Sequence, residues 1–244
     1  MAGGFGGLLA NSETVDRLLD EMDEADRKSL QGWYWFDWAN QAFALTVITV
    51  VVPTLLSNMF NLANGGSADY GGMTFTGDSF YAVVLGISSV FVAIVSPVLG
   101  AIADRMPIKK KILKVYTVVG ILFTGLMGLA PYMDEDSSYK FLAICLIMGN
   151  IGFAGGHAIY SAFLPYLGDK RLMDHISSWG YAYGFLGGCI LLTFHLAVGL
   201  KFGFENPDVQ CFVFVTSALW WLGFSIPMFL NTPEPVSYTH LTLP

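Results

Sequence analysis

The chain carries few charged residues. Only 13% of its 244 residues are Asp, Glu, Lys or Arg, whereas 54% are hydrophobic. A soluble domain carries about 25% charged residues, so this composition argues against a single soluble domain. The polar stretches between the apolar runs are short and leave no room for an inserted soluble domain. The sequence therefore indicates a polytopic membrane protein.

Motifs of membrane hydrolases and metalloenzymes are missing. The chain contains no GxSxG, no HExxH and no His and Asp at metal-ligand spacing. His157 and Ser161 are one helical turn apart, but no third residue is placed to orient them as a dyad. No filter loop or charged ring typical of a channel is evident. We predict that the chain has no catalytic residue and is not an enzyme.

Cysteine is also scarce. Three cysteines, Cys145, Cys189 and Cys211, lie within or beside apolar segments, and their spacing fits no metal site. Buried free thiols are the expected state. We predict neither a bound metal nor a cofactor.

Six segments are apolar over the roughly 20 residues that a bilayer-spanning helix needs. They cover residues 39–62, 80–103, 112–133, 141–166, 177–200 and 209–230. The stretches 61–79 and 134–139 between spans are expected to form irregular or acidic loops. The sequence predicts an all-α, six-helix transmembrane domain over residues 32–235.

The two ends of the chain differ from this domain. Residues 1–31 are expected to be a cytoplasmic segment, with a short amphipathic helix in 11–30 that only leads into the first span. Residues 236–244, VSYTHLTLP, resemble a translated sequencing adapter and are expected to be an artefact. The natural protein is then expected to continue past Pro235.

The distribution of basic residues predicts the orientation. With a cytoplasmic N-terminus, only Lys140 and Lys201 of the 12 Lys and Arg residues lie in outer loops. This bias follows the positive-inside rule and places both ends of the chain inside. It also explains the Lys109–Lys111 cluster without a nucleic-acid partner.

Two apolar spans carry polar faces. The motif GWYWFDWANQAF, residues 32–43, places Asp37, Asn40 and Gln41 on one side of the first helix. In the fourth span Asn150, His157 and Ser161 share a face, flanked by Tyr160. Polar groups at such depth are costly unless they meet protein, water or cargo.

We interpret these seven residues as a site for substrate binding or coupling. Two alternatives remain open. Asp37 caps a helix or lies among headgroups in a belt of tryptophans, and His157 hydrogen-bonds to a neighbouring helix.

The segment GAIADRMPIKKKIL, residues 100–113, resembles the signature between the second and third spans of the major facilitator superfamily. Five residues match that signature: Gly100, Asp104, Arg105, Lys109 and Lys110. Pro107 stands where the superfamily usually has glycine. The resemblance implies a conformational latch that joins the two halves of a transporter in its outward-open state. The alternative is a plain positive-inside loop.

The chain also resembles the autophagy-related vacuolar effluxer family. Three motifs carry this resemblance: GWYWFDWANQAF (32–43), AIYSAFLPYL (158–167) and ISSWGYAYGFLGG (176–188). One departure is Ser161, where relatives usually carry Asn. The resemblance implies that the chain is the N-terminal half of a major facilitator fold, built from two inverted three-helix repeats. The first and fourth helices would line a central cavity. The glycines of the fifth span would lie where the two halves slide, although close helix packing alone also explains them.

For function, the resemblance implies a secondary transporter that exports a small polar metabolite, with amino acids favoured, by alternating access. Proton coupling through Asp37 and His157 is a hypothesis. The implied partners are the solute, protons, the lipid bilayer and a missing C-terminal half. The membrane would be the plasma membrane in a prokaryote or the vacuolar membrane in a fungus. The alternatives are a half-size carrier that forms homodimers and a non-transporting membrane interaction protein.

Overall fold

The computed structural model describes residues 14–235, except for the side chains of residues 102–105. The adapter-like residues 236–244 lie outside the described part. Six helical segments within it are long and apolar enough to cross a membrane. The first consists of α2 (Glu24–Ala42), the π-helix η1 (Phe43–Val51) and α3 (Val52–Asn64), and the others contain α4 (Gly77–Arg105), α5 (Lys109–Met127), α6 (Glu135–Ser161), α7 (Met173–Phe202) and α8 (Pro207–Asn231). The prediction of an all-α polytopic membrane protein is confirmed.

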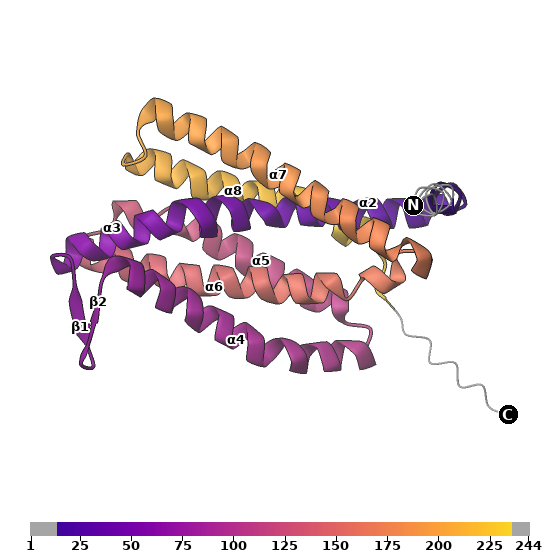
Figure 1. Cartoon of the computed structure of the whole chain (residues 1–244), viewed down its shortest axis with the longest axis horizontal. Helices are drawn as coiled ribbons and strands as arrows, with labels where there is room; N and C mark the ends of the chain where they lie inside the picture. Colours follow the sequence, from indigo (N-terminus) through magenta and orange to yellow (C-terminus); the bar gives the residue numbers. More distant parts are fainter. Residues whose placement is uncertain (1–13, 236–244) are drawn as a thin grey trace, which may run out of the picture.

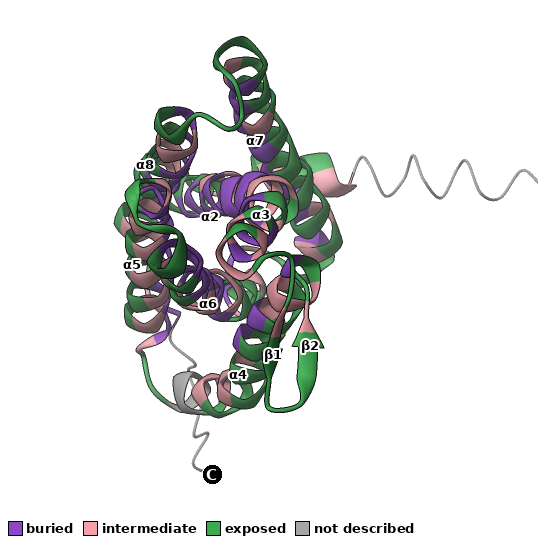
Figure 2. Ribbon diagram, turned by 90° about the vertical axis from the view of Figure 1, so that its left-hand side faces the viewer, coloured by how far each residue is buried: buried purple, intermediate pink, exposed green. Residues whose placement is uncertain are grey.

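The helices form an elongated bundle in which α2 and α6 run through the middle (Figures 1 and 2). Helix α2 packs against α7 and α8, and α6 packs against α4 and α5. Helices α7 and α4 lie at opposite edges of the bundle (Figure 2). The start of α2 and the end of α8 share one end, which we call the terminal end, and the opposite end is the hairpin end (Figure 1).

The hydrophobic core is divided into two clusters along the bundle. The cluster toward the terminal end contains Trp33, Phe36 and Tyr160, and the cluster toward the hairpin end contains Phe43 and Trp221. The boundary between them falls on α2 between Phe36 and Ala39. Asp37 therefore lies between two apolar layers.

The connection after the first span contains a short β-hairpin. Strands β1 (Ala68–Tyr70) and β2 (Met73–Phe75) pair antiparallel. Gly71 and Gly72 join them with φ of 61° and 81°, and positive φ at both central residues is the mark of a type I′ hairpin turn. The expectation of an irregular loop was wrong here, because a Gly-Gly pair between short strand-forming runs is itself a hairpin signal.

The acidic stretch 134–139 also differs from its expected loop. Helix α6 starts at Glu135, and the Asp134 side chain caps it by accepting a hydrogen bond from the Ser137 N–H at 3.0 Å. Hydrogen bonding to Ser137 lowers the pKa of Asp134. The acids at 134–136 favour the helix start because they lie at the positive end of its dipole.

The lead-in before the first span is part of the folded domain. Residues 14–20 are helical, and Asp23 then caps α2, which runs without a break through residue 31. Leu18 is buried against the core cluster of the terminal end. Residues 1–13 of the lead-in lie outside the described part. The described part of this segment therefore belongs to the bundle, because it covers the terminal end.

The π-helix η1 interrupts the first span, and sequence analysis did not anticipate it. In its register the Val52 N–H donates to the carbonyl of Val47, five residues back. In the same register the Ile48 carbonyl would accept a hydrogen bond from the N–H of residue 53. Residue 53 is a proline and has no N–H. The Tyr81 hydroxyl of α4 donates to that Ile48 carbonyl at 2.8 Å. Tyr81 therefore supplies the hydrogen bond that Pro53 cannot make.

Replacing Tyr81 by Phe should destabilise the bundle. The variant leaves the Ile48 carbonyl without a donor inside an apolar helix pair, and an unmade bond of this kind costs about 1–3 kcal/mol. The free energy of unfolding, measured by SDS titration in mixed micelles, reports the loss. Tyr116→Phe is the control, because the Tyr116 hydroxyl makes no hydrogen bond in the described chain. Equal losses in both variants would refute this role of Tyr81.

Candidate functional site

Asp37 is a buried carboxylate without a partner. It is 3% exposed, and its Oδ1 accepts no hydrogen bond. No ion pair of the described residues involves it, because the basic side chains lie near the ends of the helices. The alternative in which Asp37 lies among headgroups does not fit this burial, and neither does a capping role, because α2 continues beyond it to Ala42.

Glycines of α7 allow Asp37 to lie this deep. A Cβ atom on Gly184 would lie 2.5 Å from Asp37 Oδ2 and 2.9 Å from Gln41 Cγ. The carboxylate therefore rests against the backbone of α7, with the half-buried Gln41 beside it. Any side chain larger than hydrogen at position 184 would push both groups away.

The same contact extends along α7. Cβ atoms on its glycines would collide with residues of α2 and η1: Gly180 with Trp33, Gly187 with Trp38, and Gly188 with Leu45 of η1 and with the carbonyl oxygen of Gln41. The glycine face is therefore covered by α2. Close helix packing explains the pattern, and the expectation that this face slides against another half is not met in the structure.

Tyr160 joins α6 to α2. Its ring stacks on Trp33 with centroids 4.4 Å apart and planes 11° apart, and it also stacks on Phe36 at 5.2 Å. The Tyr160 hydroxyl donates to the Trp33 carbonyl at 3.3 Å, and Trp33 Nε1 donates to the Tyr160 carbonyl at 3.3 Å. The hydroxyl proposed for substrate is therefore engaged with α2 in this state.

The polar face of α6 divides into two parts. Asn150 is buried and donates from Nδ2 to the Ser88 hydroxyl of α4 at 2.8 Å. His157 and Ser161 are exposed, and the Ser161 hydroxyl donates to the His157 carbonyl at 2.9 Å. The three residues share a face by spacing, but α4 covers only its first part. The structure thus brings neither Asn150 nor Ser161 together with Asp37.

Asn40 is buried on α2 with its amide unpaired. It is 1% exposed, and neither Oδ1 nor Nδ2 has a partner. One turn further along the first span, Phe43 of η1 packs against the Trp221 ring of α8, with ring centroids 5.4 Å apart. On α8 the Ser225 hydroxyl is also buried without a partner. Sequence analysis did not single out Ser225, which is one of three hydroxyl residues in this span, with Thr216 and Ser217.

The structure describes only part of the segment proposed as a latch, because the side chains of Asp104 and Arg105 lie outside the described part. A Cβ on Gly100 would meet no atom within 4 Å, so no described helix makes the close approach expected there. This fits the position of α4 at the edge of the bundle (Figure 2).

The two matching lysines of this segment, Lys109 and Lys110, contact other residues of the same chain. Lys109 is buried, with its ammonium group 4.9 Å from the centroid of the Tyr166 ring. Lys110 Nζ donates to the Thr232 carbonyl at 2.6 Å, and its backbone N–H donates to Glu234 Oε2 at 3.0 Å. These contacts fasten the start of α5 to the segment after α8 and to the short helix η3 (Leu164–Tyr166) that follows α6.

Other charges at the terminal end are paired locally. Arg171 donates to Asp169 through Nε at 3.0 Å and Nη2 at 2.8 Å. This hydrogen bonding holds the pKa of Asp169 well below its usual range. Arg27 donates to the carbonyls of Leu19 and Asp20 at 2.8 and 3.0 Å and so ties the lead-in helix to α2.

No metal or disulfide chemistry is visible within residues 14–235. No three His, Cys, Asp or Glu side chains there are close enough to hold an ion. Cys145, Cys189 and Cys211 are free, as expected, but Cys189 is exposed on α7 and only Cys145 is fully buried.

Six apolar helices with an unpaired carboxylate between two core layers define an integral, multi-pass membrane protein. The model of the family described as vacuole effluxer Atg22-like matches residues 25–236. The chain therefore belongs to this family, and the resemblance seen in its motifs is confirmed.

Similar curated proteins come from a bacterium and from yeasts. An uncharacterized MFS-type transporter, YxiO of Bacillus subtilis, is 28% identical over 207 residues, covering 82% of this chain and 46% of that protein. Autophagy-related protein 22 of Kluyveromyces lactis is 24% identical, covering 84% of this chain and 47% of that protein, and its Candida glabrata counterpart is 22% identical, covering 89% and 49%. The chain spans about half the length of these relatives. No solved structure matches it significantly.

Proposed function

We propose that this chain forms half of a secondary active transporter that exports a small polar metabolite, with amino acids as the favoured cargo, by alternating access. One observation carries the proposal: Asp37 is buried, ionisable and unpaired between the two core clusters. An isolated charge in such a place is costly. An intramembrane ionisable residue with no structural partner points to a transport pathway or a proton relay.

The surroundings of Asp37 suit a site that opens and closes. In this state the carboxylate is enclosed by α2 and α7, and Tyr160 fastens α6 to α2 through two hydrogen bonds at 3.3 Å. His157 and Ser161 lie exposed on α6. We propose that cargo contacts these exposed groups first, and that release of the Tyr160 contact gives it access to Asp37 and Gln41. Asn150 would hold α4 against α6 during the movement.

The partners and orientation follow from the same proposal. A second six-helix half would complete the cavity, and Gly100, Asp104 and Arg105 would contact it as the latch. The excess of Lys and Arg at the terminal end favours a cytoplasmic position for that end. The membrane would be the plasma membrane in a prokaryote or the vacuolar membrane in a fungus.

Transport by the longer protein tests the proposal. Long-read sequencing of the native locus past the codon for Pro235 would supply the continuing frame, in which we expect six further spans. Proteoliposomes containing the encoded protein should exchange labelled amino acids in a counterflow assay, whereas those containing the 244-residue chain should not. No counterflow of any polar metabolite by the longer protein would refute the function. Counterflow by the 244-residue chain alone would favour the half-size carrier.

A further inference from the structure

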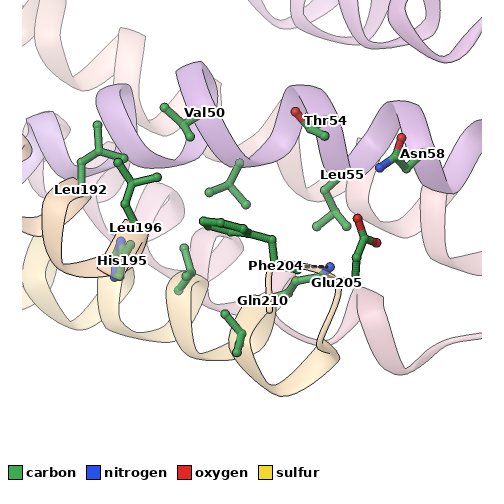
Figure 3. Close-up of a pocket in the computed structure, with 13 residues that line it drawn as sticks. Val50, Thr54, Leu55, Asn58, Leu192, His195, Leu196, Phe204, Glu205 and Gln210 are labelled. Atoms are coloured by element: carbon green, nitrogen blue, oxygen red, sulfur yellow. Dashed lines mark hydrogen bonds between the residues drawn. The ribbon is translucent and has the colours of Figure 1, made fainter. Parts of the chain in front are cut away.

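A mostly apolar cavity with a few polar groups lies near the hairpin end, away from Asp37. Its volume is about 320 Å³, and its walls come from η1, α3, α7, α8 and the connection between α7 and α8 (Figure 3). This volume is at the lower limit of sites that bind small molecules, which span about 300–1,000 Å³. Along the first span, Val50 of the cavity lies 13 residues after Asp37, which at 1.5 Å per residue is roughly 20 Å. The cavity is therefore separate from the proposed transport site.

The turn between α7 and α8 shapes the cavity. Gly203 has a φ of 90°, which a residue with a side chain rarely adopts. The chain then folds back, so that the Phe204 ring packs on Gly199 and forms part of the cavity wall (Figure 3). Most of the remaining lining is aliphatic. The backbone turn at Gly203 therefore places the Phe204 ring in the cavity wall.

His195 provides a buried hydrogen-bond acceptor in this wall. The Thr216 hydroxyl donates to the Phe212 carbonyl at 2.6 Å, so the same oxygen accepts from His195 Nε2 at 2.8 Å. Nε2 therefore carries the hydrogen, and in the neutral ring Nδ1 is an acceptor. His195 is 2% exposed and its Nδ1 has no partner. Because Nδ1 is itself fully buried, a ligand in the cavity would not reach it, and His195 contributes only to the wall.

The mouth of the cavity is also rich in acceptors. Gln210 Nε2 donates to the Phe204 carbonyl at 2.9 Å, which leaves the amide oxygen of Gln210 free to accept. The exposed carboxylate of Glu205 lies at the same rim, and no Lys or Arg lines the cavity (Figure 3). An anionic ligand would meet a carboxylate and no cation there, whereas a cationic ligand would meet a complementary charge.

We propose that this cavity binds an amphiphile with a protonated amine head. The ammonium group lies at the rim and donates to Glu205 and Gln210, and the apolar body lies against Val50, Leu192 and Phe204. Hydrogen bonds from an ammonium group to a carboxylate are about twice as strong as those between neutral groups. The aliphatic lining supplies the remaining binding free energy through burial of apolar surface. This inference goes beyond the proposed transport of a polar metabolite and does not depend on it.

Photolabelling of the full 244-residue chain in phosphatidylcholine nanodiscs tests the proposal. The probe is dodecylamine carrying a diazirine, and the labelled peptides are identified by mass spectrometry. We expect labels in residues 50–58 and 192–213. Unlabelled dodecylamine should compete at least ten times better than dodecanoate, which has the same chain length and the opposite charge. Equal competition by the amine and the carboxylate would overturn the proposal.

Three variants keep this test specific. Glu205→Gln should weaken dodecylamine competition about tenfold, a loss of about 1.4 kcal/mol. Glu135→Gln, which removes an exposed acid at the same end of the bundle but outside the cavity, should not change it. Leu196→Trp, at a partly exposed lining position, should fill the cavity and abolish labelling. Unchanged competition in Glu205→Gln, or an equal loss in Glu135→Gln, would show attraction to surface charge and refute the site.

Discussion

A Gly152→Ala variant should lose about 3 kcal/mol of its free energy of unfolding. Gly152 lies where α6 crosses α5, and a Cβ on it would collide with the backbone N and Cα of Gly120 and lie 2.8 Å from the Tyr116 carbonyl oxygen. Because these are backbone atoms, no side chain can rotate away to make room. The two helices would have to separate, and overpacking of this kind typically costs about 1–3 kcal/mol.

The neighbouring Gly156 offers a matched control on the same helix. A Cβ there would lie 3.5 Å from Tyr116 Cβ and 3.9 Å from Leu113 Cδ1, which are ordinary contacts. Gly156→Ala removes the same backbone flexibility and adds the same methyl group. It should therefore be neutral, or stabilising by up to about 1 kcal/mol, because Ala favours a helix over Gly.

SDS titration in mixed micelles, followed by circular dichroism, measures both variants on the same scale. The difference between them isolates the collision at the α5–α6 crossing from the change in helix propensity. If Gly152→Ala and Gly156→Ala unfold at the same SDS fraction, the two helices do not pack as closely as the structure shows. Separation of α5 and α6 would also disturb the core around Gly120, against which the Trp221 ring of α8 packs.

The six spans were predictable because a bilayer imposes a length and an apolar composition on each helix. The observed segments differ from the predicted ones mainly at their ends, because capping residues determine where each helix begins. Asp23 and Asp134 start α2 and α6 earlier than hydropathy alone indicates. The ends are set by single hydrogen bonds, which a window of apolar residues does not detect.

The candidate site was predictable only in part. A carboxylate within an apolar motif marked Asp37, and its burial without a partner supports that choice. Helical spacing gives the face of a residue but not the helix that covers it, so the contact of Asn150 with Ser88 was not foreseen. The covering of the α7 glycines by α2 was missed for the same reason. The π-helix depends on Pro53 and on the distant Tyr81, a long-range pairing that local sequence does not encode.

Replacing Asp37 by Asn should stabilise the fold and stop transport. The substitution removes the charge while it keeps the volume that fits against Gly184. Because burial of an unpaired carboxylate costs free energy, we expect the variant to gain about 0.5–2 kcal/mol of unfolding free energy, the usual range for one stabilising substitution. The same change removes the group that would exchange a proton or bind a cationic part of the cargo. Counterflow by the longer protein should then fall at least tenfold.

The exposed Asp26 of the same helix provides the control. Asp26→Asn removes one negative charge from α2, but the cap contact at this position is made by the Asp26 backbone N–H, which donates to Asp23 Oδ1 at 2.8 Å. Counterflow should not change, and stability should fall by at most about 1 kcal/mol, because Asp26 lies in the first turn of α2 at the positive end of its dipole. A general effect of net charge on expression, insertion or the surface potential would appear in both variants.

The two readouts of Asp37→Asn separate the possible roles of this carboxylate. A structural role predicts lower stability together with lower transport, because a packing or hydrogen-bonding contact would be lost. A functional role predicts the opposite signs, since sites retained for activity are commonly held at a cost in stability. Lower stability of Asp37→Asn would refute the functional interpretation even if counterflow also fell. Unchanged counterflow would refute it whatever the stability, because the buried charge would then serve neither cargo nor coupling.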